Sequence, residues 1–242
     1  MGATVGFRLL FGHFTDIEHR IDVAGVTTAG RDAPCYDGAA AVVPAGDWRP
    51  INEDEAEQLR PDETTPRSLV VELVSRPLPL EPAAGLAARR QVATALDPLN
   101  GRWPRQLLAC TDSPPGRLTT TQDHHNGGAR IGLHVDNWDR QPYPDRLTSR
   151  RRLALNMGPG TRYLLLGDRT IVDICRALGR DQDTHVPHTN DLRDYVAEGH
   201  PLRCLRIRLD PGHGYIAPTE VVPHDGSTTE ATDWSVAAFW LG

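Results

Sequence analysis

The stretch Gly132-Leu133-His134-Val135-Asp136-Asn137-Trp138-Asp139 places two polar side chains in an apolar run. In an extended chain, alternate residues point to the same face, so His134 and Asp136 project together while Val135 packs on the other side. One imidazole and one carboxylate make up two-thirds of the 2-His-1-carboxylate triad that binds Fe(II). The alternative is a surface turn in which Asp136 and Asn137 bond the local backbone.

A second histidine has to come from elsewhere in the chain, and three places offer one. His124 and His125 lie in a polar, Gly-rich loop before the stretch, and His185 and His188 lie in a loop with Pro and Asp. His224 follows an apolar segment and precedes the last apolar segment of the chain. We predict that His224 is the second histidine ligand, with the histidines of the other two places as alternatives.

Length and composition predict a globular protein and exclude several functions. With 242 residues, of which 39% are hydrophobic, the chain suits one large domain or two small ones. The net charge is -6 and the basic residues are dispersed, apart from Arg150-Arg151-Arg152, so no nucleic-acid partner is expected. All 26 Lys+Arg residues are Arg, which excludes chemistry that depends on a lysine, such as Schiff-base formation.

The cysteines and the apolar segments bear on the cellular compartment. Cys35, Cys110, Cys175 and Cys204 form no C-x-x-C pair, which argues against a zinc knuckle or a thioredoxin-type site. We expect them to be buried small hydrophobes in a reducing compartment. No apolar run is long enough for a signal peptide or a membrane span, so the expected protein is cytoplasmic and does not contact membranes.

The pattern of apolar residues predicts a mainly β protein with flanking helices. The segments Val5–Phe11, Ala39–Val43 and Leu69–Val74 are strand-like, and Pro82–Leu96 has helical spacing. From Leu107 onward, short apolar runs alternate with Pro and Gly, as in a β-sandwich or barrel. The expected strands there are Gln106–Cys110, Ala129–Val135, Arg152–Met157, Thr161–Leu166, Leu202–Leu209, Tyr215–Ala217 and Trp234–Trp240.

Further segments complete the expected organisation of a single domain, with an α/β extension over residues 1–106 and a β core over 107–242. Thr170–Leu178 and Asn190–Glu198 are expected helices, the second with Asn190 as its N-cap. Gly158-Pro159-Gly160 predicts a turn. The polar segment Trp48–Arg67 is expected to be a solvated loop and a candidate lid over the mouth of a barrel.

In the order and spacing of these features, the C-terminal half resembles the Fe(II)/2-oxoglutarate-dependent oxygenases of the double-stranded β-helix (jelly-roll, cupin-like) superfamily. The matching features are His134-x-Asp136 on an early strand, the strand end Leu155-Asn156-Met157-Gly158, the Asp210-Pro211-Gly212 turn and the distal Pro223-His224-Asp225-Gly226 segment. The resemblance covers about Leu107 to Gly242 and implies a jelly-roll core.

The resemblance also implies a reaction. His134, Asp136 and His224 would be the catalytic metal ligands, Fe(II) the cofactor and 2-oxoglutarate the cosubstrate. O2 and a small molecule, such as an amino acid or a biosynthetic intermediate, would be the other reactants. A carboxylate at Asp136 favours hydroxylation or desaturation over halogenation. The alternatives are a jelly-roll iron enzyme that does not use 2-oxoglutarate and a jelly-roll that binds a small ligand without catalysis.

The far carboxylate of 2-oxoglutarate needs a cationic anchor, and arginine matches a carboxylate best. Many members of the family have an Arg after the distal histidine, but this chain has none from Asp225 to its end. Arg152 is our first choice because it alternates in register with Ala154 and Asn156. Arg162, Arg206 and Arg208 are the other candidates.

Several neighbouring residues have expected supporting roles. Asn156 and Tyr163 are candidate hydrogen-bond donors to the cosubstrate, with Tyr143 a weaker one. Asp139 and Asp225 are expected to make turn or outer-sphere hydrogen bonds. Trp138 follows the expected ligands closely enough to line a substrate site.

Overall fold

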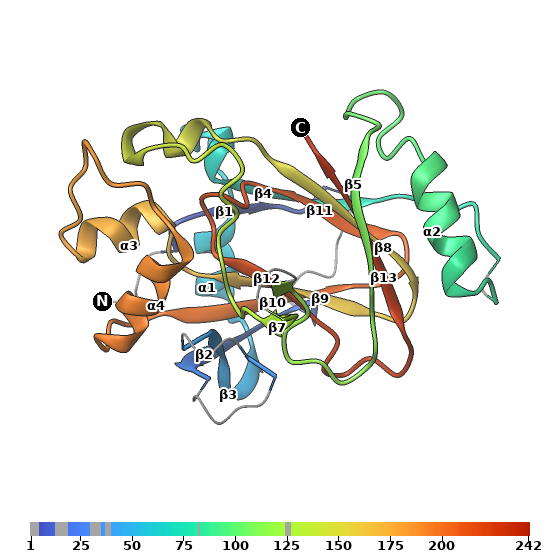
Figure 1. The fold of residues 1–242 in the computed structure, drawn as a ribbon, viewed down its shortest axis with the longest axis horizontal. Coiled ribbons are helices and arrows are strands. Elements are labelled where there is room, and N and C mark those ends of the chain that lie inside the picture. Colours follow the sequence, from blue (N-terminus) through green and yellow to red (C-terminus); the bar gives the residue numbers. More distant parts are fainter. Residues whose placement is uncertain (1–4, 13–18, 30–34, 37–39, 82, 124–126) are drawn as a thin grey trace.

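The computed structural model describes residues 5–12, 19–29, 35–36, 40–81, 83–123 and 127–242. The described chain is mainly β, with two large sheets, one two-stranded sheet and a few helices (Figure 1). The first sheet has the order β1 (Arg8–Leu10), β4 (Val70–Ser75), β11 (His213–Ala217), β8 (Arg152–Pro159), β13 (Ser235–Leu241) and β5 (Leu107–Ser113). The second has the order β12 (His224–Ser227), β9 (Arg162–Gly167), β10 (Arg203–Leu209), β2 (Ile21–Thr28) and β3 (Val42–Pro50).

The remaining elements surround these sheets. The small sheet pairs β6 (Gln122–Asp123) with β7 (Ala129–Arg130). The helices are α1 (Glu53–Leu59), α2 (Leu86–Ala95), α3 (Ile171–Ala177) and α4 (Thr189–Ala197), and short 3-10 turns cover Arg67–Leu69 and Tyr143–Thr148. Strands from the N-terminal third lie in both large sheets, so this part of the chain extends the sheets of the C-terminal part.

Side-chain alternation along the strands divides the core into layers. The inner layer joins the two sheets and includes Ala154 and Tyr215 from the first sheet and Leu164 from the second. The outer face of the first sheet packs under α2, and the outer face of the second packs under α3 and α4, which Figure 1 shows at opposite ends of the molecule. A strand with both faces covered buries nearly every residue, as the pattern of β9 shows.

Most elements expected from the sequence are present. Every strand expected from residue 106 onward has an observed counterpart within a few residues except Ala129–Val135, of which only Ala129–Arg130 is a regular strand and Leu133 and His134 form isolated bridges. The helices expected over 82–96, 170–178 and 190–198 are observed as α2, α3 and α4. Of the expected turn Gly158-Pro159-Gly160, the first two residues belong to β8, and Gly160 lies in the connection from β8 to β9.

Three local expectations were wrong. Trp48–Arg67 is a loop only after α1: β3 runs to Pro50, and Asn52 then forms a capping box with Glu55 that starts α1, whose Ala56 and Leu59 are buried in the inner layer. The N-cap of α4 is His188, not Asn190, because the His188 imidazole accepts from the backbone. Cys175 and Cys204 are buried as expected, but Cys110 is half-buried and Cys35 is exposed.

Within the described residues, no helix has the length and apolar character needed to cross a membrane.

Candidate metal centre

The strand β12 and the segment that holds His134 bring two histidines face to face. The two residues exchange both backbone hydrogen bonds, His134 N to His224 O at 3.1 Å and His224 N to His134 O at 2.8 Å. Residues paired in this way project to the same side, and the ring centroids lie 4.5 Å apart. Asp136 is held one step further along by a bond from its amide to the Thr219 carbonyl at 2.9 Å.

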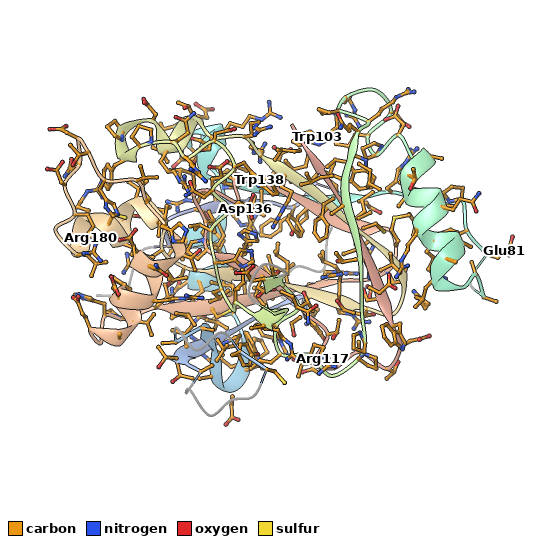
Figure 2. All side chains as sticks on the ribbon, in the orientation of Figure 1. Glu81, Trp103, Arg117, Asp136, Trp138 and Arg180 are labelled. Carbon is orange, nitrogen blue, oxygen red and sulfur yellow. The ribbon has the colours of Figure 1, made fainter. Side chains whose placement is uncertain are left out.

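The three side chains therefore converge as the sequence predicted for His134 and Asp136, and His224 is the histidine that joins them. One ligand atom from each lies within 4.8 Å of the others. The carboxylate oxygens of Asp136 lie 4.0 Å from His134 Nε2 and 3.9 Å from His224 Nε2. Figure 2 shows Asp136 near the middle of the molecule, with Trp138 close by.

Backbone carbonyls orient both imidazoles. His134 Nδ1 lies 2.9 Å from the Gly132 carbonyl, and His224 Nδ1 lies 3.2 Å from the Val222 carbonyl. Because a carbonyl can only accept, each Nδ1 carries the proton and each Nε2 presents a lone pair to the site. Metal-binding histidines commonly have this outer hydrogen bond, which fixes the ring and its tautomer.

The charge states also suit a metal. Burial raises the pKa of Asp136, but Arg152 and the two histidines outweigh it, so the pKa lies below that of an ordinary aspartate. Burial, followed by Arg152 and His134, holds the pKa of His224 well below its usual value. An ionised carboxylate and a neutral imidazole are the forms that coordinate a cation.

Gly132 allows the ligand-bearing segment to approach β3. Its φ is +69°, in the left-handed region, and a Cβ there would lie 2.3 Å from the Val42 carbonyl oxygen. Leu133 N donates to that same carbonyl at 2.8 Å. Val135 and Leu133 pack into the outer layer, so His134 and Asp136 face inward as the alternation predicts.

A fully buried ion pair between Arg146 and Glu220 supports the same segment, and no sequence pattern had pointed to it. Arg146 Nη1 lies 3.2 Å from the Glu220 carboxylate, and neither side chain is exposed. Arg146 also donates to the backbone carbonyls of Asp136 at 2.7 Å and Glu220 at 2.8 Å, and to the Asn137 side chain at 2.8 Å. This one guanidinium thus ties the Asp136 segment to the turn that precedes His224.

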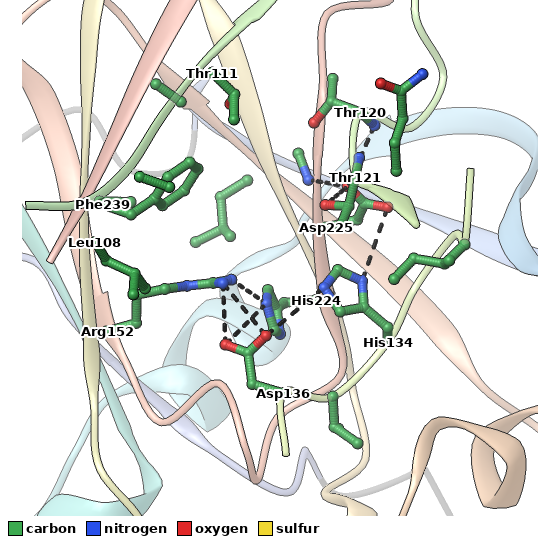
Figure 3. Close-up of a pocket in the computed structure, with 18 of the residues that line it drawn as sticks. Leu108, Thr111, Thr120, Thr121, His134, Asp136, Arg152, His224, Asp225 and Phe239 are labelled. Carbon is green, nitrogen blue, oxygen red and sulfur yellow. Dashed lines mark hydrogen bonds and ion pairs between the residues drawn. The ribbon is translucent and has the colours of Figure 1, made fainter. Parts of the chain in front are cut away.

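Asp225 has the supporting role expected from the sequence. Its Oδ1 accepts hydrogen bonds from the backbone of Thr120 and Thr121 and from the Thr121 hydroxyl, while Oδ2 lies 4.0 Å from His134 Nδ1 (Figure 3). Burial raises the pKa of Asp225. Asp139, the other expected supporting residue, forms an exposed ion pair with Arg150 at 2.5 Å.

A cavity of about 1250 Å³ lies over the three candidate ligands. Its walls include Tyr215, Ala154 and Phe239 from the first sheet, and the half-exposed Trp138 also lines it, as the sequence predicted. None of the described residues that line the cavity belongs to Trp48–Arg67, the expected lid.

Arg152 enters the cavity, as its alternation with Ala154 predicted. Its Nη1 lies 3.0 Å from Asp136 Oδ2, and its Nη2 contacts His224 Nε2 (Figure 3). The guanidinium also lies over the Phe239 ring, 5.2 Å from its centroid. Arg152 therefore sits directly against two of the candidate metal ligands.

Arg162 enters the same cavity from β9 but lies further from the candidate ligands. Its Nη2 is 3.4 Å from the Thr120 hydroxyl, and its Nη1 has no hydrogen-bond partner among the described residues. It is 6% exposed. A Cβ on Gly226 would lie 2.5 Å from Arg162 Nη2, so the glycine makes room for this guanidinium. The buried Tyr215 interacts electrostatically with both Arg162 and Arg152.

The other expected cosubstrate residues have different partners. The Asn156 amide donates to two backbone carbonyls and accepts from Gly158 N and Ser235 Oγ, which leaves it no free donor. The Tyr163 hydroxyl donates to Glu230 at 2.9 Å. Arg206 pairs with Asp22 and Glu230, Arg208 pairs with Asp210, and the Tyr143 hydroxyl donates to the Val172 carbonyl.

Neither His185 nor His188 belongs to this ligand cluster, although His188 also lines the cavity and caps α4 through its imidazole. His124 and His125 lie outside the described residues. His185 Nε2 lies 2.9 Å from Asp191, which also accepts from Arg180 and the His188 amide. Cys175 completes a second cluster with His185 and Asp191. Burial raises the pKa of the Cys175 thiol to about 12, and Asp191 is already paired with Arg180 and His185.

A search against protein-family models found no match, and a search of curated proteins found no significant match.

Proposed function

We propose that the protein is a non-haem Fe(II)/2-oxoglutarate-dependent oxygenase that hydroxylates or desaturates a small metabolite. The observation that carries the proposal is the convergence of His134, Asp136 and His224 at the base of a cavity, with both Nε2 atoms presented to it. This donor set is the 2-His-1-carboxylate type that leaves positions open for substrate and O2.

The strand order supports a double-stranded β-helix. From β5 onward, the chain visits the first sheet, then the second through the His134 segment beside β12, then the first with β8. It continues through β9 and β10 in the second sheet, β11 in the first, β12 in the second and β13 in the first. Eight segments divided between two facing sheets in this way, with β9 and β10 as an antiparallel pair in the middle, are typical of a jelly-roll.

The residues of the chain would hold the iron and limit the access of water to it. His134, Asp136 and His224 would hold the iron, which when bound supplies the oxidising chemistry, with O2 as oxidant and 2-oxoglutarate decarboxylated to succinate. Asp136, being ionised, would offset part of the metal charge. Phe239 and Ala154 would keep the wall apolar, which limits competing reactions with water.

Arg162 is better placed than Arg152 to anchor the far carboxylate of 2-oxoglutarate. A chelating dicarboxylate keeps that group several ångströms from the metal, whereas Arg152 touches His224 itself. Arg162 lies against Gly226, two residues beyond His224, or roughly 7 Å along an extended strand. Its unpartnered Nη1 and the neighbouring Tyr215 are donors that a buried carboxylate requires.

Anaerobic addition of Fe(II) and 2-oxoglutarate tests the proposal. We expect a weak visible charge-transfer band when both chelate. Iron binding without the band would favour a jelly-roll iron enzyme that does not use 2-oxoglutarate. The absence of iron binding would favour a jelly-roll that binds a small ligand without catalysis.

We predict that Arg162→Gln weakens 2-oxoglutarate binding about a hundredfold, because removing one partner of a buried charge pair costs roughly 3 kcal/mol of binding free energy. The titration of the visible band with 2-oxoglutarate measures this. Arg208→Gln, which removes an exposed arginine paired with Asp210, is the control and should leave the titration unchanged. A wild-type titration curve for Arg162→Gln would exclude Arg162 as the anchor.

Gly226→Ala is predicted to have a similar but smaller effect. The new methyl group would overlap Arg162 Nη2 and the Thr120 hydroxyl, so the guanidinium must move away from its position. We expect 2-oxoglutarate binding to weaken about tenfold while metal affinity stays within threefold of wild type. Equal losses of metal and 2-oxoglutarate affinity would instead indicate that the substitution disturbs β12 as a whole.

A further inference from the structure

The cavity contains a second cation for which the proposed cosubstrate provides no partner. Arg152 and Arg162 both point into the interior, and the carboxylates near them are Asp136 and Asp225. Asp136 belongs to the candidate metal site, and Asp225 Oδ1 accepts from Thr120 and Thr121. If a cosubstrate carboxylate neutralises Arg162, the close ion pair left to Arg152 is the one between its Nη1 and Asp136, at 3.0 Å, and Asp136 is shared with the candidate metal site.

The hydrogen bonds of Arg152 show which edge of its guanidinium would be available. Nη1 binds Asp136, Nη2 contacts His224 Nε2, the guanidinium also hydrogen-bonds the Tyr215 side chain, and Nε has no partner among the described residues. The lone pair on an imidazole nitrogen can serve one partner. When His224 Nε2 binds a metal, it can no longer accept from Arg152, so Nη2 loses this partner and lies beside Nε, which has none.

Nε and Nη2 form one edge of the guanidinium, and such an edge binds a carboxylate through two parallel hydrogen bonds. The Phe239 ring beneath the guanidinium and the ion pair with Asp136 fix its plane. The side chain is 12% exposed, so the pairing would be largely shielded from water. An anion bound there would lie beside the metal ligands.

We propose that Arg152 binds a carboxylate of the substrate itself, so that the substrates are small carboxylic acids, amino acids included. This inference rests on the proposed function, because it assigns Arg162 to 2-oxoglutarate and leaves Arg152 to the substrate. It makes Arg152 a specificity-determining residue rather than a cosubstrate anchor.

The test measures binding to protein loaded with Mn(II), which coordinates oxygen and nitrogen ligands without starting the reaction. Calorimetry would first titrate 2-oxoglutarate into wild type, Arg152→Gln, Arg152→Lys and Arg162→Gln. A panel of aliphatic and aromatic monocarboxylic acids and free L-amino acids, each matched with its primary amide, would then be titrated into the loaded proteins.

We expect at least one acid to bind wild type ten or more times more tightly than its amide. Arg152→Gln should lose this preference, Arg152→Lys should keep part of it, and both should bind 2-oxoglutarate within threefold of wild type. Arg152→Gln should bind Mn(II) at least as tightly as wild type, because a neighbouring cation has been removed. Arg152→Lys should bind Mn(II) about as tightly as wild type.

Three results would overturn the assignment: no acid binds better than its amide, Arg152→Gln keeps the preference, or Arg152→Gln weakens 2-oxoglutarate binding as much as Arg162→Gln does. The last result would make Arg152 the anchor. Failure of wild type to bind 2-oxoglutarate at all would remove the proposed function instead, and this first titration separates the two failures.

Discussion

Replacing His224 with alanine is expected to abolish metal binding while the protein stays folded. The variant loses one of three metal ligands. Its affinity for the metal should therefore fall by more than the 10–100-fold that is typical when a residue hydrogen-bonded to a ligand is lost. The substitution removes the hydrogen bond from Nδ1 to the Val222 carbonyl, worth about 1 kcal/mol, and the contact of Nε2 with Arg152. Calorimetric titration with Mn(II), together with thermal unfolding, measures both effects.

His134→Ala and Asp136→Ala should behave in the same way, and iron-dependent turnover should disappear in all three variants. His185→Ala is the matched control, because His185 contacts Asp191 in the separate cluster and should not affect metal affinity. Retention of wild-type metal affinity by His224→Ala would show that the distal ligand has been misassigned and would direct the search to His185 and His188.

The Arg146→Met substitution is expected to lower the free energy of unfolding by about 3–5 kcal/mol, because it leaves the buried Glu220 carboxylate without its partner. It also removes the donors to the Asp136 and Glu220 carbonyls. Urea unfolding measures the loss. The exposed pair of Arg60 and Glu57 provides a control, since Arg60→Ala should cost about 0–1 kcal/mol.

The cost of Arg146→Met should depend on pH in a definite direction. Burial already raises the pKa of Glu220 even with Arg146 present, and without Arg146 the folded state should bind a proton there more tightly than the unfolded state does. The variant should therefore recover part of its deficit as the pH falls from 8 to 5. Arg146→Met/Glu220→Gln should be more stable at pH 8 than Arg146→Met, and equal stability would argue against an unpaired charge as the cause.

Features that depend on local alternation and spacing could be predicted from the amino-acid sequence alone. Period-two alternation placed His134 and Asp136 on one face and Val135 on the other, and it directed Arg152 inward beside Ala154. Apolar runs bounded by Pro and Gly marked the strands from residue 106 onward and the helices α2, α3 and α4. These signals are local, because strand and helix periods are properties of the backbone itself.

Contacts between residues far apart in the chain could not be predicted in this way and are seen in the folded protein. Alternation fixes the face of a side chain but not the strand opposite it, so the pairing of His134 with His224 follows from long-range register. The same limit applies to the Arg146–Glu220 pair and to Tyr215 beside both cavity arginines. The choice between Arg152 and Arg162 likewise depends on how far each guanidinium lies from His224, and that distance is set by the packing of two sheets against each other.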